Sequence, residues 1–203
     1  FRTPSSIFYI NSLFYLPLIK YYSFNFTAVI VLIFANVILL KKIGITFSSK
    51  ILSFKKELNQ PYEIIFFSLL SLMFINIFFY RIGEHGTDRS AQILIMLLII
   101  EIIDALQRKN YNKILNLKIF TLVIFIISLK AFYILYLLLL LPLYYSYYKS
   151  FKSHYLIIKN LLSGYLYFYF LIFLLILSSY FFNTGCLIYP IEITCFDNLS
   201  WSI

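Results

Sequence analysis

The chain has 203 residues, of which 62% are hydrophobic and 12% are charged. Soluble globular proteins have roughly 45–50% apolar and about 25% charged residues, so this composition excludes a soluble domain and indicates a polytopic membrane protein. The net charge of +9 does not indicate a nucleic-acid partner, because the lysines occur in short clusters beside apolar segments, where the cytoplasmic loops of membrane proteins carry them.

Apolar segments that could cross a membrane follow one another along the chain. A span needs about 20 predominantly apolar residues. Residues 5–19 are apolar but short, and they read as the tail of an upstream helix or as an interfacial helix. Residues 91–106 carry Glu101 and Asp104, yet their unbroken apolar centre favours a span. Three segments meet the length without difficulty, namely 22–40, 62–80 and 161–182.

The distribution of basic residues decides how many times residues 117–148 cross the membrane. This stretch is long for one span, and Lys130 interrupts it. Basic residues cluster in three segments, 41–56, 108–118 and 149–159. The positive-inside rule places all three in the cytoplasm only if residues 117–148 cross twice. We therefore predict a hairpin of two short helices that turns near Lys130.

The predicted fold is all-α, a transmembrane bundle of about six spans, because helices satisfy their own backbone hydrogen bonds in lipid. Residues 1–203 read as one integral membrane domain. The chain starts at Phe1 rather than Met and stops within a polar stretch, so we expect a fragment that is incomplete at both ends. This topology places residues 81–90, the Lys130 turn and residues 183–203 on the outer side of the membrane.

Residues 81–90, RIGEHGTDRS, form a polar island between two apolar runs. Its glycines and hydroxyl or carboxylate residues predict a turn that feeds a helix beginning near Arg89, with Thr87 or Asp88 as the cap. A helix N-terminus presents free N–H groups and positive dipole character, so this end suits a phosphate or pyrophosphate.

The charged side chains of the island could also carry chemistry. Glu84 and Asp88 could bind a divalent metal ion or act as a general base, with His85 as a proton carrier. The alternative is a solvated turn in which the aspartate caps the helix and the arginines pair with carboxylates.

Two further ionisable residues interrupt apolar runs. Lys130 has no charge partner among its sequence neighbours, so it either faces a cavity and binds an anionic group or snorkels to the headgroups. Glu101 is the most deeply embedded carboxylate, and we expect it to pair with a polar group of another helix. Asp104 is expected at the cytoplasmic interface.

Cys186 and Cys195 are the only cysteines of the chain. The outer face of an inner membrane is oxidising, which favours a disulfide that closes a small loop. If the topology were inverted, the same residues would be two reduced thiols in a cytoplasmic loop. Two cysteines without a nearby histidine do not complete a zinc site.

Two strings, EHGTDRS at residues 84–90 and TGCxxYPxxxTC at residues 184–195, resemble an uncharacterised family of bacterial multi-pass inner-membrane proteins. That family is grouped with GT-C type, polyprenyl-phosphate-sugar-dependent glycosyltransferases, and paired short helices near a lysine are also similar to GT-C proteins. The resemblance implies transfer of a sugar from a lipid-phosphate carrier to a cell-surface glycan or lipid.

The resemblance also implies roles for particular residues. His85, Thr87, Arg89 and Lys130 would hold the carrier phosphate, whereas Glu84 or Asp88 would position a metal ion or the acceptor hydroxyl. GT-C proteins usually carry an essential acidic residue in the first outer loop, and residues 2–6 contain none. The resemblance therefore leaves the position of the catalytic base open: it lies upstream of Phe1, or it is Glu84 or Asp88 of the polar island.

Three other functions stay open: a transporter or flippase of lipid-linked oligosaccharide, a glycan polymerase, and a membrane protein without catalytic activity. Transport requires ionisable residues along a path through the bilayer, whereas a transferase concentrates them at one face. Deep positions offer little beyond Asn76 and Glu101, which favours a one-sided site.

Overall fold

The structure is a computed structural model that describes residues 26–52, 62–78, 87–108, 113–151, 165–188 and 191–196. These residues are almost entirely helical, which confirms the predicted all-α bundle. The predicted segment 5–19 lies outside the described residues. The helices are α2 (Phe26–Leu52), α3 (Tyr62–Phe78), α4 (Thr87–Arg108), α5 (Lys113–Leu129), η2 (Ala131–Leu140), α6 (Leu141–Phe151), α8 (Tyr165–Thr184) and the short η3 (Glu192–Thr194).

Four of the helical stretches are long and apolar enough to cross a membrane, namely Phe26–Gly44, Asp88–Gln107, Ala131–Lys149 and Tyr167–Thr184. Two shorter apolar helices, Tyr62–Ile77 and Leu115–Leu129, accompany them. This composition indicates membrane association. Large apolar side chains are exposed on every one of the four long stretches except α4, as expected where lipid surrounds the bundle.

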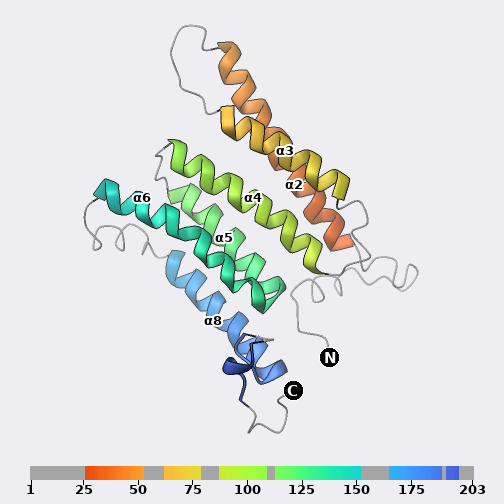
Figure 1. Ribbon diagram of the computed structural model, residues 1–203, viewed down its shortest axis with the longest axis vertical. Helices are drawn as coiled ribbons and strands as arrows, with labels where there is room; N and C mark the ends of the chain where they lie inside the picture. Colours follow the sequence, from red (N-terminus) through yellow and green to blue (C-terminus); the bar gives the residue numbers. More distant parts are fainter. Residues whose placement is uncertain are drawn as a thin grey trace.

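The central helix of the bundle is α4. Of its apolar window, 67% is buried, compared with 11% for α8, because α4 contacts α2, α3, α5, η2 and α6 whereas α8 packs mainly on α5. Figure 1 shows α2 and α3 on one side of α4 and α5, η2–α6 and α8 on the other. The core accordingly follows α4 from end to end, with fully buried side chains such as Ile93, Leu97 and Leu98.

The predicted hairpin at Lys130 is confirmed. The backbone of Lys130 is extended, with φ −158° and ψ 131°, and it separates α5 from η2, which runs back along α5. As a result, the start of α4, the Lys130 turn and the end of α8 lie at one end of the bundle, at the lower right of Figure 1. The end of α4, the start of α5 and the end of α6 lie at the opposite end.

The stretch Ala131–Leu140 is a 3₁₀ helix of ten residues, which the sequence did not predict. Runs of this kind rarely exceed three or four residues. Burial follows the three-residue period, because Phe132, Leu135 and Leu138 are exposed whereas Tyr133 is buried and Tyr136 is half-buried. A rise of about 2.0 Å per residue makes η2 roughly 20 Å long, so η2 and α6 together can span a hydrocarbon core of about 30 Å.

Helix α2 extends well beyond its predicted end at residue 40. It continues to Leu52, so Lys41, Lys42 and Lys50 lie on the helix rather than in a basic loop. A long aliphatic stem allows lysine to remain helical near the membrane surface while its ammonium group reaches polar partners. The basic segment of the first loop is thus largely the last turns of α2.

Candidate functional site at the Lys130 turn

The Lys130 turn brings the side chains of Lys130 and Tyr133 to Asp88, which is distant from both in the sequence. Lys130 Nζ donates a hydrogen bond to Asp88 Oδ1 at 2.8 Å. The hydroxyl of Tyr133 donates to the same oxygen at 3.2 Å. The two donors converge on one carboxylate oxygen and thereby fix the orientation of Asp88.

Local structure positions each of these groups. Helix α4 begins at Thr87, two residues before the predicted start, so Asp88 lies in its first turn, where the helix dipole favours a carboxylate. The extended backbone of Lys130 ends α5, and the N–H of Tyr133 donates to the carbonyl of Lys130 at 3.0 Å to open η2. The first turns of α4 and η2 therefore face each other across the Lys130 turn.

The ion pair is accessible rather than sealed in the core. The side chain of Lys130 is 37% exposed and that of Asp88 is 41% exposed. An ion pair at this exposure contributes only about 0–1 kcal/mol to stability. Its charges can therefore be exchanged for those of a ligand at modest cost.

The predicted site residues are only partly described. Asp88 and Lys130 lie together as an ion pair. The sequence predicted that Lys130 either binds an anionic group in a cavity or snorkels to the headgroups, and neither prediction named Asp88 as its partner. Arg89 is half-buried beside Asp88 in the first turn of α4. Glu84 and His85 lie outside the described residues, as does the side chain of Thr87. Within the described part of the chain, no group of three or more His, Cys, Asp and Glu side chains could hold a metal ion.

Tyr133 and Tyr180 were missed by the sequence analysis. The buried Tyr180 donates from its hydroxyl to the carbonyls of Ile127 and Ser128, at 3.0 and 2.9 Å. These carbonyls belong to the last turn of α5, so Tyr180 holds the last turns of α8 against the Lys130 turn. Among 19 tyrosines, nothing in the sequence distinguishes these two.

The end of α8 leads directly into a disulfide-closed loop. Cys186 and Cys195 form a disulfide and an isolated antiparallel bridge. Gly185, with φ 73°, ends α8 in the left-handed conformation that glycine adopts without strain. Phe196 packs edge-on against Phe181, with ring centroids 5.5 Å apart, and its N–H donates to the carbonyl of Gly185. The loop is therefore folded back onto the end of α8.

Removal of the disulfide should destabilise the protein measurably. The bridge closes a loop with a sequence separation of 9. The chain-entropy relation gives about 2 to 3 kcal/mol for a loop of this length. We expect the double variant Cys186→Ser/Cys195→Ser to lose this amount in a denaturant titration, and wild-type protein treated with reductant to match it. Reductant should leave the double variant unchanged, and a further loss there would contradict the assignment.

A second polar cluster lies at the opposite end of the bundle. Lys42 Nζ lies 3.0 Å from Glu101 Oε1 and 3.1 Å from Asp104 Oδ2. Glu101 pairs with another helix, as expected, and Asp104, which is 8% exposed, contacts the same lysine. One turn further along α4, Gln107 donates a hydrogen bond to Glu63 of α3. The cluster joins α2, α3 and α4 through charge-assisted contacts.

Comparison with known proteins places the whole described bundle in one family. Residues 3–203 match the family described as Domain of unknown function (DUF8201). The chain belongs to this family. Both the Lys130 turn and the disulfide loop fall within the matched region of the DUF8201 chain. No curated protein and no solved structure matches it.

Proposed function

We propose that this DUF8201 protein is a glycosyltransferase of the GT-C type in a bacterial inner membrane, which transfers a sugar from a lipid-phosphate carrier to a cell-surface glycan or lipid. The observation that carries the proposal is the accessible pair of Asp88 and Lys130, with Tyr133 bonded to the same carboxylate. A cation for the carrier phosphate and a carboxylate for the acceptor then stand side by side at one membrane face.

In the proposed reaction each of these side chains has one role. The acceptor hydroxyl oxygen attacks the anomeric carbon of the sugar, and its proton passes to the carboxylate of Asp88. The bond between the anomeric carbon and the phosphate oxygen breaks, and the phosphate takes the electron pair. Lys130 and Arg89 then stabilise the additional negative charge on the phosphate, helped by the N-terminal dipole of α4. Tyr133 orients the carboxylate without touching the substrate.

Two observations support a location of the Lys130 turn on the outer side of the membrane. The disulfide loop requires an oxidising compartment, and Tyr180 links its helix to the Lys130 turn. Lysines near the other end, at positions 41, 42, 118 and 149, match the cytoplasmic side of the positive-inside rule. In this proposal Glu84 would position a metal ion or the acceptor hydroxyl, and His85 would help to bind the carrier phosphate.

The proposal is tested by alanine substitutions in the complete protein. We expect His85→Ala, Asp88→Ala and Arg89→Ala each to reduce the surface glycan or glycolipid and to cause the sugar-loaded carrier to accumulate. Mass spectrometry of extracted lipids and of the cell-surface glycan measures both. Tyr145→Ala, at an exposed position of α6, serves as the control. Unchanged glycan in all three variants would refute the transferase.

A flippase of lipid-linked oligosaccharide is the second candidate, because the buried Lys42, Glu101 and Asp104 provide ionisable groups at the other end of the bundle. A flippase variant would trap the sugar-loaded carrier in the inner leaflet, whereas a transferase variant would trap it in the outer leaflet. Accessibility of the accumulated carrier to an externally added lectin distinguishes the two.

A further inference from the structure

Two asparagines form an amide pair that joins α2 to α3. Asn76 Nδ2 donates a hydrogen bond to Asn36 Oδ1 at 2.7 Å, and Asn36 Nδ2 donates to Asn76 Oδ1 at 3.3 Å. Asn76 Nδ2 also donates to the carbonyl of Leu72, one turn earlier on α3, at 2.8 Å. Asn76 is exposed and Asn36 is half-buried, so the pair lies at the surface of the bundle rather than in its core.

The amide pair lies at the middle of a span. Asn36 is close to the centre of the membrane-spanning stretch Phe26–Gly44, roughly 15 Å from Phe26 at 1.5 Å per residue. Asn76 is bonded to Asn36 and therefore lies at the same depth. Polar side chains at this depth usually face the bundle interior or another helix, because hydrocarbon offers an amide no hydrogen-bond partner. An exposed amide here indicates that a polar partner covers it.

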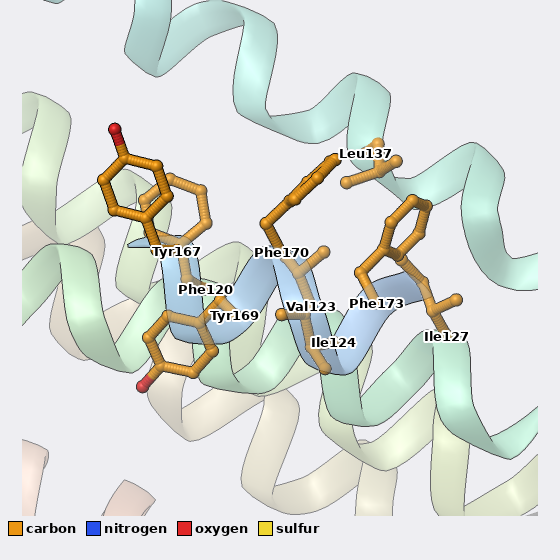
Figure 2. A pocket seen from close by; sticks show the side chains of 9 residues that line it. All are labelled: Phe120, Val123, Ile124, Ile127, Leu137, Tyr167, Tyr169, Phe170 and Phe173. Carbon is orange, nitrogen blue, oxygen red and sulfur yellow. The ribbon is translucent and has the colours of Figure 1, made fainter. Parts of the chain in front are cut away.

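The opposite side of the bundle differs from this surface. Figure 1 places α2 and α3 on one side of α4, and α5, η2 and α8 on the other. Figure 2 shows nine side chains of that other side, of which seven are hydrocarbon only and two are tyrosines. The hydroxyl of Tyr169 lies 2.7 Å from that of Thr121, and Tyr167 lies in the first turn of α8, where its hydroxyl can reach the headgroups. These nine side chains suit contact with lipid, whereas α3 exposes an amide at mid-depth.

The amide pair retains hydrogen-bonding capacity of both kinds. Each amide has two N–H donors and an oxygen that can accept two hydrogen bonds. Among the described residues, Asn36 Nδ2 makes one hydrogen bond and each of the two amide oxygens accepts one. One N–H of Asn36 and one acceptor position on each oxygen therefore remain for a partner. A surface that offers donors and acceptors together can pair with an identical surface.

Exposed apolar side chains surround the pair at helical spacing. They are at least 44% exposed and comprise Ile33, Val37 and Leu40 of α2 and Leu69 and Met73 of α3. On α3, the positions of Leu69, Met73 and Asn76 follow the alternating steps of four and three residues that form a seam between two packed helices. A single asparagine in such a seam sets the register of the two helices, because it pairs with a polar group of the facing helix.

We propose that a second copy of this chain packs on the face formed by α2 and α3, with Asn76 at the centre of the contact. Most homo-oligomers are two-fold dimers, and two copies inserted with the same topology can share only an axis along the membrane normal. Such an axis brings each residue to the depth of the same residue in the second copy, so the two Asn76 amides meet. Each copy then supplies the donors and acceptors that the other requires. The dimer does not depend on the proposed transferase activity.

Energy transfer between fluorescent labels in lipid vesicles measures the association. The complete protein, labelled with donor or acceptor, is reconstituted in phosphatidylcholine and diluted with lipid. We expect wild type to dimerise, and Asn36→Leu/Asn76→Leu to weaken dimerisation about tenfold, because hydrogen bonds between helices in a membrane are lost. The double replacement leaves neither asparagine without its intramolecular partner. Asn183→Leu is the matched control, the same substitution at an exposed asparagine of α8, and it should associate like wild type.

Cysteine cross-linking tests the geometry without changing either amide, so it also covers the case in which the double variant does not fold. Cys186 and Cys195 are joined in a disulfide, so one introduced cysteine supplies the reactive thiol. Met73→Cys should form a disulfide-linked dimer under mild oxidation, whereas Leu175→Cys, in the middle of α8, should not. The two positions are 61% and 60% exposed.

Three results would overturn the dimer. The first is equal cross-linking of the two cysteine variants, and the second is unchanged association of the folded Asn36→Leu/Asn76→Leu variant. The third is a wild-type protein that stays monomeric at every protein-to-lipid ratio, which would assign the amides to lipid, to another segment of the chain or to a different protein.

Discussion

Replacement of Lys42 by Met should lower the free energy of unfolding by about 3 to 5 kcal/mol, because it leaves two buried carboxylates without their cation. The ammonium group lies within 3.1 Å of both Glu101 and Asp104, and the three side chains are at most 12% exposed. Titration with SDS or steric trapping in bicelles measures the loss. The triple variant Lys42→Met/Glu101→Met/Asp104→Leu should recover most of the stability, because apolar replacements of similar size remove the uncompensated charges.

Lys41→Met provides the matched control for this prediction. Lys41 precedes Lys42 on α2 but is exposed. Its replacement should change stability by no more than about 0.5 kcal/mol. An equal effect of the two lysine variants would mean that the cluster does not depend on Lys42. Failure of the triple variant to recover would mean that the polar groups hold α2 on α4 by more than charge compensation.

The helical architecture could be predicted because lipid leaves few alternatives. Apolar runs of sufficient length identified the helices, and the distribution of lysine and arginine identified the hairpin at Lys130. Helix ends were less predictable. Hydropathy falls where lysines begin, whereas α2 continues to Leu52, because a lysine can stay helical and direct its charge away from the apolar region.

The 3₁₀ conformation of η2 could not be predicted. Residues 131–140 are apolar on every side, so the sequence shows neither a period of 3.6 nor a period of 3.0. The period emerges only from packing, in which Tyr133 and Tyr136 face the bundle while Phe132, Leu135 and Leu138 do not. The conformation matters for the site because the first turn of η2 presents Tyr133 to Asp88.

The candidate site was predicted in its residue types but not in its contacts. Asp88 and Lys130 were each singled out because a charge in an apolar chain needs a reason. Their pairing spans 42 residues and results from the packing of α4, α5 and η2, which no local pattern encodes. The same holds for the buried ionic contact between Lys42 and Asp104, which joins α2 to α4 and which no local pattern encodes.

Within the proposed transferase, Asp88→Asn should reduce kcat by about 100-fold or more, the contribution typical of a general base. The substitution keeps the size of the side chain and its ability to accept a hydrogen bond from Tyr133, so positioning of the carrier should survive. The carrier's KM should therefore change little. Purified protein, sugar-loaded isoprenyl phosphate and a glycan acceptor allow both constants to be measured.

Lys130→Met should produce a different kinetic pattern, because the lysine is proposed to hold the carrier phosphate in both the ground state and the transition state. We expect the carrier's KM to rise by about tenfold or more, together with a loss in kcat. The double variant Asp88→Asn/Lys130→Met should lose less activity than the product of the two single losses, because Asp88 and Lys130 contact each other directly. Strictly multiplicative effects would mean that the two residues act independently and that their ion pair is incidental.

Substitution of Tyr133 tests whether the orientation of the Asp88 carboxylate matters, because Tyr133 bonds to Asp88 and is not proposed to touch the substrate. Tyr133→Phe should lower kcat by about threefold to tenfold, because a typical intramolecular hydrogen bond contributes about 0.5–1.5 kcal/mol. Tyr136→Phe is the matched control, because Tyr136 lies one turn further along η2 and its ring centroid is 5.7 Å from that of Tyr133.

If Asp88→Asn keeps the wild-type kcat, the carboxylate is not the base. A selective defect in Tyr133→Phe would then place the chemistry on the tyrosine hydroxyl instead.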